Sequence, residues 1–510
     1  MSNDHLITEI VMFSIDNSVP SHMLTRLQRT MLQDSTNCIL DAPFKLTGRY
    51  QKQRDCLLLL PQPPIWTMAS SEYDWQAEKD DDDIVDMMVM ELLSSSDEEE
   101  DEDAGPPRSR KKNKDRDFPL AYANVIRDYF SGPDSIYDEK DFERRFRVPR
   151  VIFNRIWEKL QGEYPFVGPV KDALGKPGIF PLVRLVACFR HIAYGDGYDR
   201  EDEYCRMSED SVRVSAKAFC RLVKKHFPEY LNRSPSEAEK QAITERNSRR
   251  GFPGHLASWD CKHFAWHKCP MWLHGQHKGH AEGVTLILEA IADYNCYLMY
   301  ANFGDPGSLN DINVLDKSSI VGSMIDGSFN TTIEPYEING RQRDWLYFLA
   351  DGIYPDWSVF VKTYADPVDA RTRCFSKHQE GARKDVERAF GILVQKFQIL
   401  QRPLRMWNKA DAVELLHCCV ILHNMVVAHY GDDYLNQPDA KAYAEATEQD
   451  DRSWPLFGGV EVSADTIKGD GAEVFASRVS CFTGNMMSRV QHHELKEDLT
   501  EHIYTLFGEN

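Results

Sequence analysis

The sequence predicts an α/β core, a mixed sheet flanked by helices, with an all-helical domain on its N-terminal side. Apolar residues recur at three- and four-residue steps from Phe118 to about Leu231, which is the spacing of one helix face. After Gly251 the pattern changes to short apolar runs separated by turn residues, which is typical of strands. A strongly helical segment follows from about Gly381 to Leu400.

The helical region carries helix start signals as well as periodicity. Pro181 suits the first turn of a helix, and Ser208 suits the N-cap of a later helix whose first turn is acidic. Short helices ending in one with basic exposed positions could form a helix-turn-helix. By composition, an ordinary helical domain with a solvated charged face is an equal alternative. The basic positions of the later helix are Arg213, Lys217, Arg221, Lys224 and Lys225.

Four runs carry the predicted sheet. His255–Cys261 is short and mixed, whereas Thr285–Ala292 and Cys296–Phe303 are strongly apolar and enclose a plausible hairpin turn. A helix from Leu309 separates the third run from the fourth. Trp345–Ala350 is almost continuously apolar, so we expect a strand buried on both faces. Three strands, a helix, a strand and further helices is the order of an RNase H-like sheet.

The length of 510 residues suggests two to four folding units. We expect an unassigned extension at 1–117, whose charged low-complexity part stays disordered. A helical domain at 118–245, the candidate DNA-binding domain, then precedes the RNase H-like core at 246–430. An acidic linker and a C-terminal helix complete the chain at 431–510.

The formal net charge of −20 argues at first against a nucleic-acid-binding protein, because phosphate contacts need Lys and Arg. The charge is unevenly distributed, however, and a local basic face matters more than the sum. Acidic runs crowd the flanks at 80–83, 97–103 and 432–451, and basic stretches lie between them at Arg341–Arg343, Lys377–Arg388 and Lys396–Arg405. A further basic cluster, Arg108–Arg116, could be a nuclear-import signal, a non-specific DNA arm or a solvated linker.

The cysteines and the N-terminus bear on the compartment. Twelve cysteines are scattered without the regular spacing of a disulfide scaffold, which favours reduced thiols in an intracellular protein. The first residues lack a basic segment followed by a long apolar one, so we expect no signal peptide. We therefore expect a soluble protein without a membrane partner.

Three carboxylates follow or lie among apolar residues, where a charge is costly. Asp260 is expected at the end of the first short strand, and Asp351 directly follows the run Trp345–Ala350. Glu387 lies on the predicted late helix beside its packing face. Like charges at neighbouring strand ends repel one another, so such a cluster needs a bound cation.

Hard divalent ions prefer oxygen ligands of this type, so the expected cofactor is Mg²⁺ or Mn²⁺. Two such ions about 3.5–4 Å apart would activate a water and stabilise the leaving 3′ oxygen of a phosphodiester. By spacing alone the signal is weak. The alternative is that Asp351 begins a turn with Gly352, and that Glu387 lies on a solvated helix face.

At these residues the sequence resembles the PIF/Harbinger-type transposases, in the group described as plant transposon proteins. Six segments agree in the family's order, which makes the resemblance specific. They are SWDCKHFAWHKCP at 258–270, LILEAIADYNCYLMYANFGDPGSLNDINVLDKS at 286–318, FLADGIYPDW at 348–357, KDVERAFGILVQKFQIL at 384–400, HCCVILHNMVV at 417–427 and HHELKEDLTEHIY at 492–504.

The resemblance implies a triad of two aspartates and a glutamate at Asp260, Asp351 and Glu387, acting as catalytic residues and metal ligands. The last two have 35 residues between them, a spacing similar to that of such enzymes. Asp311 matches a further recurrent acid, which we expect to shape the site through hydrogen bonds or to contact metal indirectly. His263 could orient a carboxylate or contact phosphate.

The implied function is cleavage of DNA at transposon ends and joining of the 3′-hydroxyl ends to target DNA. The implied partners are terminal inverted repeats, target DNA and a Myb/SANT-like accessory protein, with a homo-oligomer as a further option and the nucleus as the location. The main alternative is a domesticated, non-cleaving protein that binds DNA or chromatin. A metal-dependent hydrolase of another substrate is the second alternative.

Overall fold

The computed structural model describes residues 114–168, 171, 175–438, 440–441 and 485–508. The extension up to residue 113, most of the basic cluster Arg108–Arg116 and the acidic linker from residue 442 lie outside the described residues. Residues Arg116–Asn510 form one compact unit, which includes both the helical region and the sheet. The domain boundaries at 117, 245 and 430 stay predictions.

The helical region forms as the periodicity predicts. Pro181 occupies the first turn of α8, and the Ser208 hydroxyl accepts a hydrogen bond from the Ser211 backbone N–H at the start of α10. Phe142, Phe153 and Phe219 are fully buried in its core. The helices are α5 (Phe118–Val125), α6 (Glu139–Phe146), α7 (Arg150–Leu160), α8 (Pro181–Tyr194), α9 (Glu201–Tyr204), α10 (Glu209–His226) and α11 (Glu237–Arg249).

The sheet mixes antiparallel and parallel pairing. Its strands, in the order β3-β2-β1-β6-β7, are β3 (Leu298–Pro306), β2 (Thr285–Ala292), β1 (His255–Ala265), β6 (Tyr347–Leu349) and β7 (Phe360–Val361). β1 pairs antiparallel with β2 and parallel with β6, and β6 pairs parallel with β7. The chain is therefore a mixed α/β protein, and the predicted hairpin of β2 and β3 is confirmed.

Three elements differ from their predicted extents. β1 continues to Ala265 because its second half pairs with β2, so Asp260 lies inside the strand and not at its end. The fourth predicted strand shortens to β6, because Arg341–Trp345 forms β5 and pairs with β4 (Thr332–Ile338) in a separate hairpin. The late helix α15 begins at Ala370, well before Gly381, with Asp369 as its N-cap.

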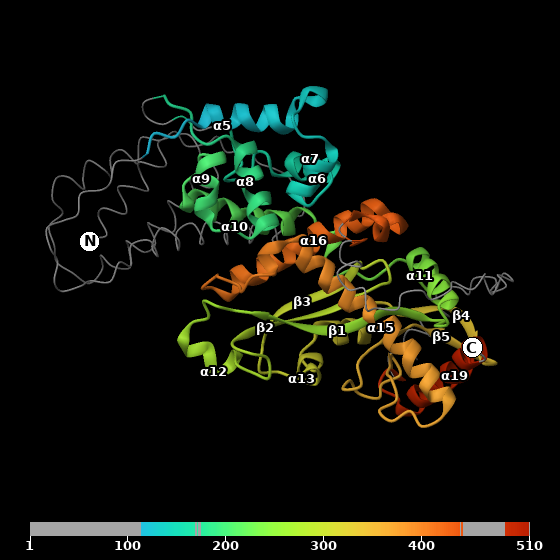
Figure 1. Cartoon of the computed structure of the whole chain (residues 1–510). Coiled ribbons are helices and arrows are strands. Elements are labelled where there is room, and N and C mark those ends of the chain that lie inside the picture. Colours follow the sequence, from blue (N-terminus) through green and yellow to red (C-terminus); the bar gives the residue numbers. More distant parts are fainter. Residues whose placement is uncertain (1–113, 169–170, 172–174, 439, 442–484, 509–510) are drawn as a thin grey trace, which may run out of the picture. The chain divides into compact units, whose positions relative to one another are not determined.

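Helices cover both faces of the sheet, as Figure 1 shows. α15 (Ala370–Lys396) packs on β1, and α16 (Lys409–Tyr430) packs on β3. Helix α13 lies on the opposite side of the sheet from α16. The short helices of the connections are α12 (His274–His277), α13 (Asp311–Leu315) and α14 (Ser319–Ile325).

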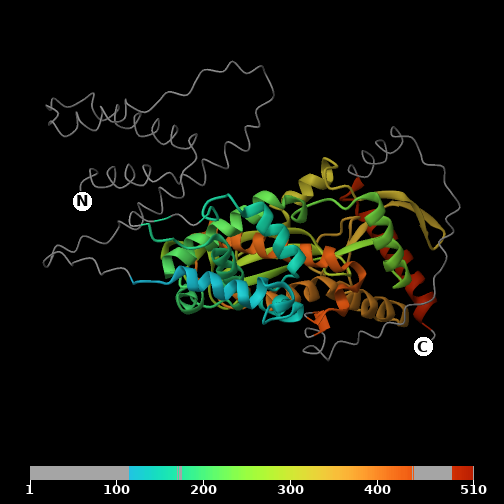
Figure 2. The same ribbon diagram turned by 90° about the horizontal axis from the view of Figure 1, so that it is seen from above.

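The C-terminal helix α19 (Arg489–Phe507) completes a second, smaller core. Its buried Leu495, Leu499 and Ile503 pack with Tyr347 and Leu349 of β6. Figure 2 shows α19 at the same end of the unit as the β4–β5 hairpin. α19 therefore supports the strand that leads into Asp351, from more than 130 residues away in the chain.

Helix α16 joins the helical region to the sheet. It contacts α10 on one side and β3 on the other. Extended to Asn436, it is the one helix in the described ranges that is long and apolar enough to cross a membrane, with a mean hydropathy of 1.5. Because 72% of its most apolar window is buried by the rest of the unit, its composition is that of a core helix.

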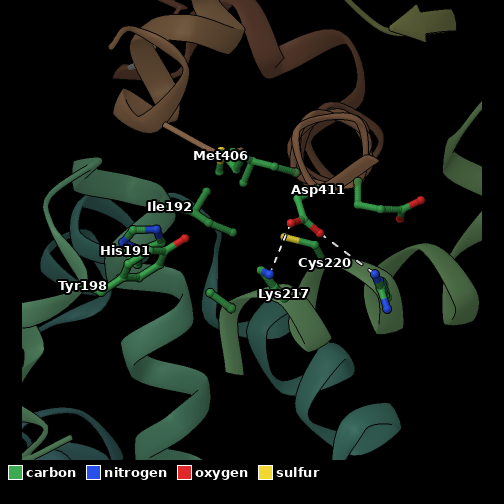
Figure 3. A pocket seen from close by; sticks show the side chains of 11 residues that line it. His191, Ile192, Tyr198, Lys217, Cys220, Met406 and Asp411 are labelled. Atoms are coloured by element: carbon green, nitrogen blue, oxygen red, sulfur yellow. Dashed lines mark ion pairs between the residues drawn. The ribbon is translucent and has the colours of Figure 1, made fainter. Parts of the chain in front are cut away.

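Three basic residues of α10, namely Lys217, Arg221 and Lys224, face this same contact. Lys217 pairs with Asp411 at 3.2 Å, and Lys224 pairs with Glu414 at 2.9 Å, both on α16. Figure 3 shows the first of these pairs at a small pocket that His191 and Tyr198 also line. A recognition helix needs such cations free for phosphate or bases. The helix-turn-helix interpretation of α10 is therefore not supported, because these cations pair within the unit.

Candidate active site

Asp260 lies half-way along β1 and faces α15. Its Oδ2 accepts a hydrogen bond from Arg383 Nη1 at 3.2 Å, and its Oδ1 accepts one from the Cys261 backbone N–H at 2.9 Å. The side chain is 17% exposed. Burial raises the pKa of Asp260 to about 6, the positive charge of Arg383 opposes this, and the negative charges of Glu387 and Asp311 add to it.

Glu387 lies one helical turn after Arg383 on α15. The Arg383 guanidinium pairs with Glu387 Oε1 at 2.9 Å through Nη2, while its Nη1 reaches Asp260. Glu387 is 44% exposed, so its carboxylate also faces solvent. A single cation therefore joins two of the predicted site residues. Sequence reasoning missed Arg383, although its four-residue spacing from Glu387 on a helix is the spacing of an ion pair.

Asp351 lies where the pairing of β1 and β6 ends. The parallel register aligns Ser258 with Leu349, so two residues further on Asp260 and Asp351 are level on neighbouring chain segments. Asp351 is exposed, and its Oδ1 accepts a hydrogen bond from the Gly352 N–H at 2.6 Å. The turn that the alternative interpretation expects is therefore present, and it holds the carboxylate at the open end of β6.

A second group of residues lies on the α13 side of β1, because neighbouring strand residues point to opposite faces. The Cys261 sulfur lies 3.7 Å from the Tyr354 hydroxyl. Burial raises the pKa of Asp311, a hydrogen bond from Cys261 and the charge of His263 oppose this, and the charge of Asp351 adds to it. His263 Nδ1 lies 2.9 Å from Thr285 Oγ1. The charge of Asp311 therefore acts on both Asp260 and Asp351, which places the predicted acids within electrostatic reach of one another.

The donor set suits a hard divalent cation, although it does not converge on one point. The set comprises the carboxylates of Asp260, Asp311, Asp351 and Glu387, of which Asp260 and Glu387 share the counter-ion Arg383. Such a set of oxygen donors is what Mg²⁺ or Mn²⁺ binds. Among the described residues, no three His, Cys, Asp or Glu side chains lie close enough together to hold a metal ion. Binding would therefore need these side chains to reorient.

The predicted basic stretches take part in internal ion pairs. Arg343 is 3% exposed and pairs with Asp498 of α19. Arg388 pairs with Asp385, which is itself buried and also pairs with Arg250. These cations hold the hairpin and α15 in place. Arg250, Arg343 and Arg388 are therefore already paired within the unit.

Comparisons with known proteins find two family matches and a curated relative. Residues 228–434 match the family described as "Plant transposon protein", and this range contains Asp260, His263, Asp311, Asp351 and Glu387. Residues 122–161 match a family described as a domain of unknown function (DUF8418). The chain is 20% identical over 298 residues to "Protein ALP1-like" of Arabidopsis thaliana, which covers 57% of this chain and 71% of that protein.

No solved structure matches the chain. The resemblance inferred from six sequence segments is therefore supported by a family match over the sheet, α15 and α16, and by a relative that extends beyond it. Together the two matches support a PIF/Harbinger-type, transposase-like protein, in which the similarity to the plant transposon protein family spans residues 228–434.

Proposed function

We propose that this transposase-like chain is a metal-dependent DNA endonuclease that cuts transposon ends and joins their 3′-hydroxyls to target DNA. The order of its sheet supports an RNase H-like core, because an antiparallel three-stranded meander is followed through helices by a parallel strand next to β1. Asp260, Asp351 and Glu387 would be the metal ligands. The nucleus would be its location, and DNA its partner.

The observation that carries the proposal is the bridge of Arg383 between Asp260 and Glu387. A half-buried aspartate beside two further acids requires positive charge, and one guanidinium supplies only part of it. A bound divalent ion would supply the rest, polarising the phosphodiester and lowering the pKa of a water. Asp260 would stay ionised beside it, Glu387 would turn from solvent toward Asp260, and Asp351 would approach from the end of β6.

The test is nicking of supercoiled plasmid by the full chain in Mg²⁺ or Mn²⁺. We expect Asp260→Asn, Asp351→Asn and Glu387→Gln each to reduce nicking at least about 100-fold, since each removes a metal ligand. Glu380→Gln is the matched control, because Glu380 lies exposed on α15 and bonds only to Thr363 among the described residues. Unreduced nicking by folded Asp260→Asn would reject the assignment.

A second candidate function is a transposase-derived protein that binds DNA without cutting it. It is favoured by the same arginine bridge, because Arg383 already neutralises two of the acids and no three carboxylates converge among the residues that the structure describes. In this case the plasmid would be bound and shifted on a gel but never nicked. Mn²⁺ binding, followed by calorimetry, separates the two functions, since only the nuclease needs it. The Myb/SANT-like accessory protein and the homo-oligomer stay predictions.

A further inference from the structure

A pair of exposed tryptophans stands at one end of the sheet. Trp272 is 74% exposed, Trp407 is 59% exposed and Met271 beside Trp272 is 78% exposed. The two indole rings lie 5.7 Å apart at an interplanar angle of 72°. We call Met271, Trp272 and Trp407 the tryptophan platform. Met271 and Trp272 directly precede α12, which is labelled in Figure 1. Large apolar side chains gathered in water mark a binding surface more often than chance.

The platform is held rigidly, although its two tryptophans are 135 positions apart. The chain around Trp266 runs beside the chain around Leu404. The Trp266 indole N–H donates to the Met406 carbonyl at 2.7 Å, and the His267 backbone N–H donates to the Leu404 carbonyl at 2.9 Å. Trp266 itself is 2% exposed. The buried Trp266 thus anchors the chain segments that carry the exposed Trp272 and Trp407. Binding should therefore cost little conformational entropy.

The surroundings of the platform are basic in a chain that is acidic overall. No Asp or Glu occurs between Asp260 and Glu282, or between Glu387 and Asp411. Lys268, Arg405 and Lys409 are exposed in these segments. Lys268 and Arg405 form no ion pair with any residue that the structure describes, so their charge is free for a partner. Arg402, by contrast, is already paired with Asp196.

We propose that the tryptophan platform binds single-stranded DNA, with unpaired bases stacked on Trp272 and Trp407 and the phosphates held by Lys268 and Arg405. Indole faces bind any base, whereas in a duplex the base faces are hidden by stacking. A protein partner would bury an apolar face, and free cations beside it would be costly to desolvate. A strand of unpaired bases is both flat and apolar on its faces and anionic along its backbone, which fits both halves of the surface.

This inference rests on the proposed function for its choice of DNA, and it deepens it by assigning a place to an unpaired strand. Trp266, which anchors the segment of the platform, follows Asp260 by six residues just past the end of β1, which is about 20 Å of extended chain. DNA whose end is unpaired during cutting or joining could occupy both places at once. Stacking at the platform would keep that end from re-pairing.

The experiment measures binding of a fluorescein-labelled 20-nucleotide oligothymidine to the full chain by anisotropy. It is done in EDTA, so that cleavage plays no part. We expect Trp272→Ala with Trp407→Ala to weaken binding about 10-fold or more, and to abolish quenching of tryptophan fluorescence by the oligonucleotide. Trp272→Phe with Trp407→Phe keeps an aromatic face at each position, so it should retain most of the affinity.

Two controls separate base stacking from non-specific apolar contact and from electrostatic attraction. Val368→Ala removes an equally exposed apolar side chain that lies between Asp366 and Asp369, and it should not change binding. Lys268→Gln with Arg405→Gln should reduce the slope of log affinity against log salt by about 1.4, because each phosphate contact on a single strand contributes about 0.7.

Two results would overturn the proposal. The first is an unchanged affinity for oligothymidine in the variant Trp272→Ala with Trp407→Ala. Binding would then be electrostatic only, without base stacking. The second is a monomer–dimer change in the alanine pair without loss of DNA binding, which would make the platform a contact between copies of the chain. Because all binding is measured in EDTA, unreduced nicking by Asp260→Asn together with intact platform binding would reject the nuclease assignment and not this site.

Discussion

The Arg383 guanidinium lies 3.2 Å from the carboxylate of Asp260, across the contact between α15 and β1. Because the same guanidinium also pairs with Glu387, it occupies the space between two proposed metal ligands. A cation that binds there has to compete with it. Arg383 should therefore set how strongly the site attracts a divalent ion.

Replacing Arg383 with Gln is expected to act in opposite directions with and without metal. In EDTA the variant should lose about 1–2 kcal/mol of stability, since two charge-assisted hydrogen bonds are removed and the acids are left without a counter-ion. In Mn²⁺ its melting temperature should rise by more than that of the wild type. Differential scanning fluorimetry measures both. Arg388→Gln is the control, because Arg388 pairs with Asp385 and should lower stability without changing the response to Mn²⁺.

Substitutions at Asp385 and Glu387, which are two residues apart, are expected to change the free energy of unfolding by very different amounts. Asp385 is 1% exposed and paired with both Arg250 and Arg388, so Asp385→Ala leaves buried cations unpaired and should cost about 3–5 kcal/mol. Glu387→Gln should change stability by no more than about 0.5 kcal/mol. Urea unfolding compares them. Equal destabilisation by both would contradict the division between a structural and a functional acid.

The C-terminal helix should be required for the stability of the sheet. Leu499 is fully buried against β6, so Leu499→Ala should lower the free energy of unfolding by about 2–5 kcal/mol. Val490→Ala, at an exposed position of the same helix, should have almost no effect. Denaturant midpoints are the measurement. A small loss at Leu499 would mean that α19 docks loosely and does not support Asp351.

Acid should destabilise the helical region through His191. Burial lowers the pKa of His191 to about 4, with only partial opposition from Asp196, so the folded state holds the ring neutral. The unfolded chain takes up the proton near pH 6.5, and stability is therefore lost as pH falls from about 6.5 toward 4. Between pH 7 and pH 5 this one group should contribute a loss of about 2 kcal/mol.

His191→Phe tests this pH dependence, because phenylalanine keeps the ring that stacks on Tyr198 and removes the titration. We expect a smaller difference in unfolding free energy between pH 7 and pH 5 in the variant than in the wild type. An unchanged difference would assign the acid sensitivity to other groups.

The sequence predicted the elements whose signals are local. The hairpin of β2 and β3 and the start of α8 follow from apolar runs, turn residues and Pro181, and they are confirmed. The β4–β5 hairpin was missed because Arg341–Trp345 is polar and half-exposed, without clear alternation. The first turns of α15 were missed because they are mostly polar, although the Asp369 side chain caps them.

In the candidate site, too, the sequence predicted features that have local signals and missed those that depend on packing. Each acid could be singled out from its own neighbours in the chain, and their roles stay predictions. The bridge of Arg383 to Asp260 could not be found in this way, because the two residues are 123 positions apart and meet only through packing of α15 on β1. The pairing of Lys217 and Lys224 with α16 could not be found from the sequence for the same reason.

The position of α16 also fixes an order of events during synthesis. Glu414, the partner of Lys224, follows 190 residues later in the chain, so the side of α10 that packs on α16 emerges from the ribosome before its partner, while α8 already covers the other side. At about 5–20 residues per second, that face waits roughly 10–40 s for its partner. Throughout this interval the nascent chain presents a binding site for chaperones, and a stop in translation before residue 409 would release an aggregation-prone fragment.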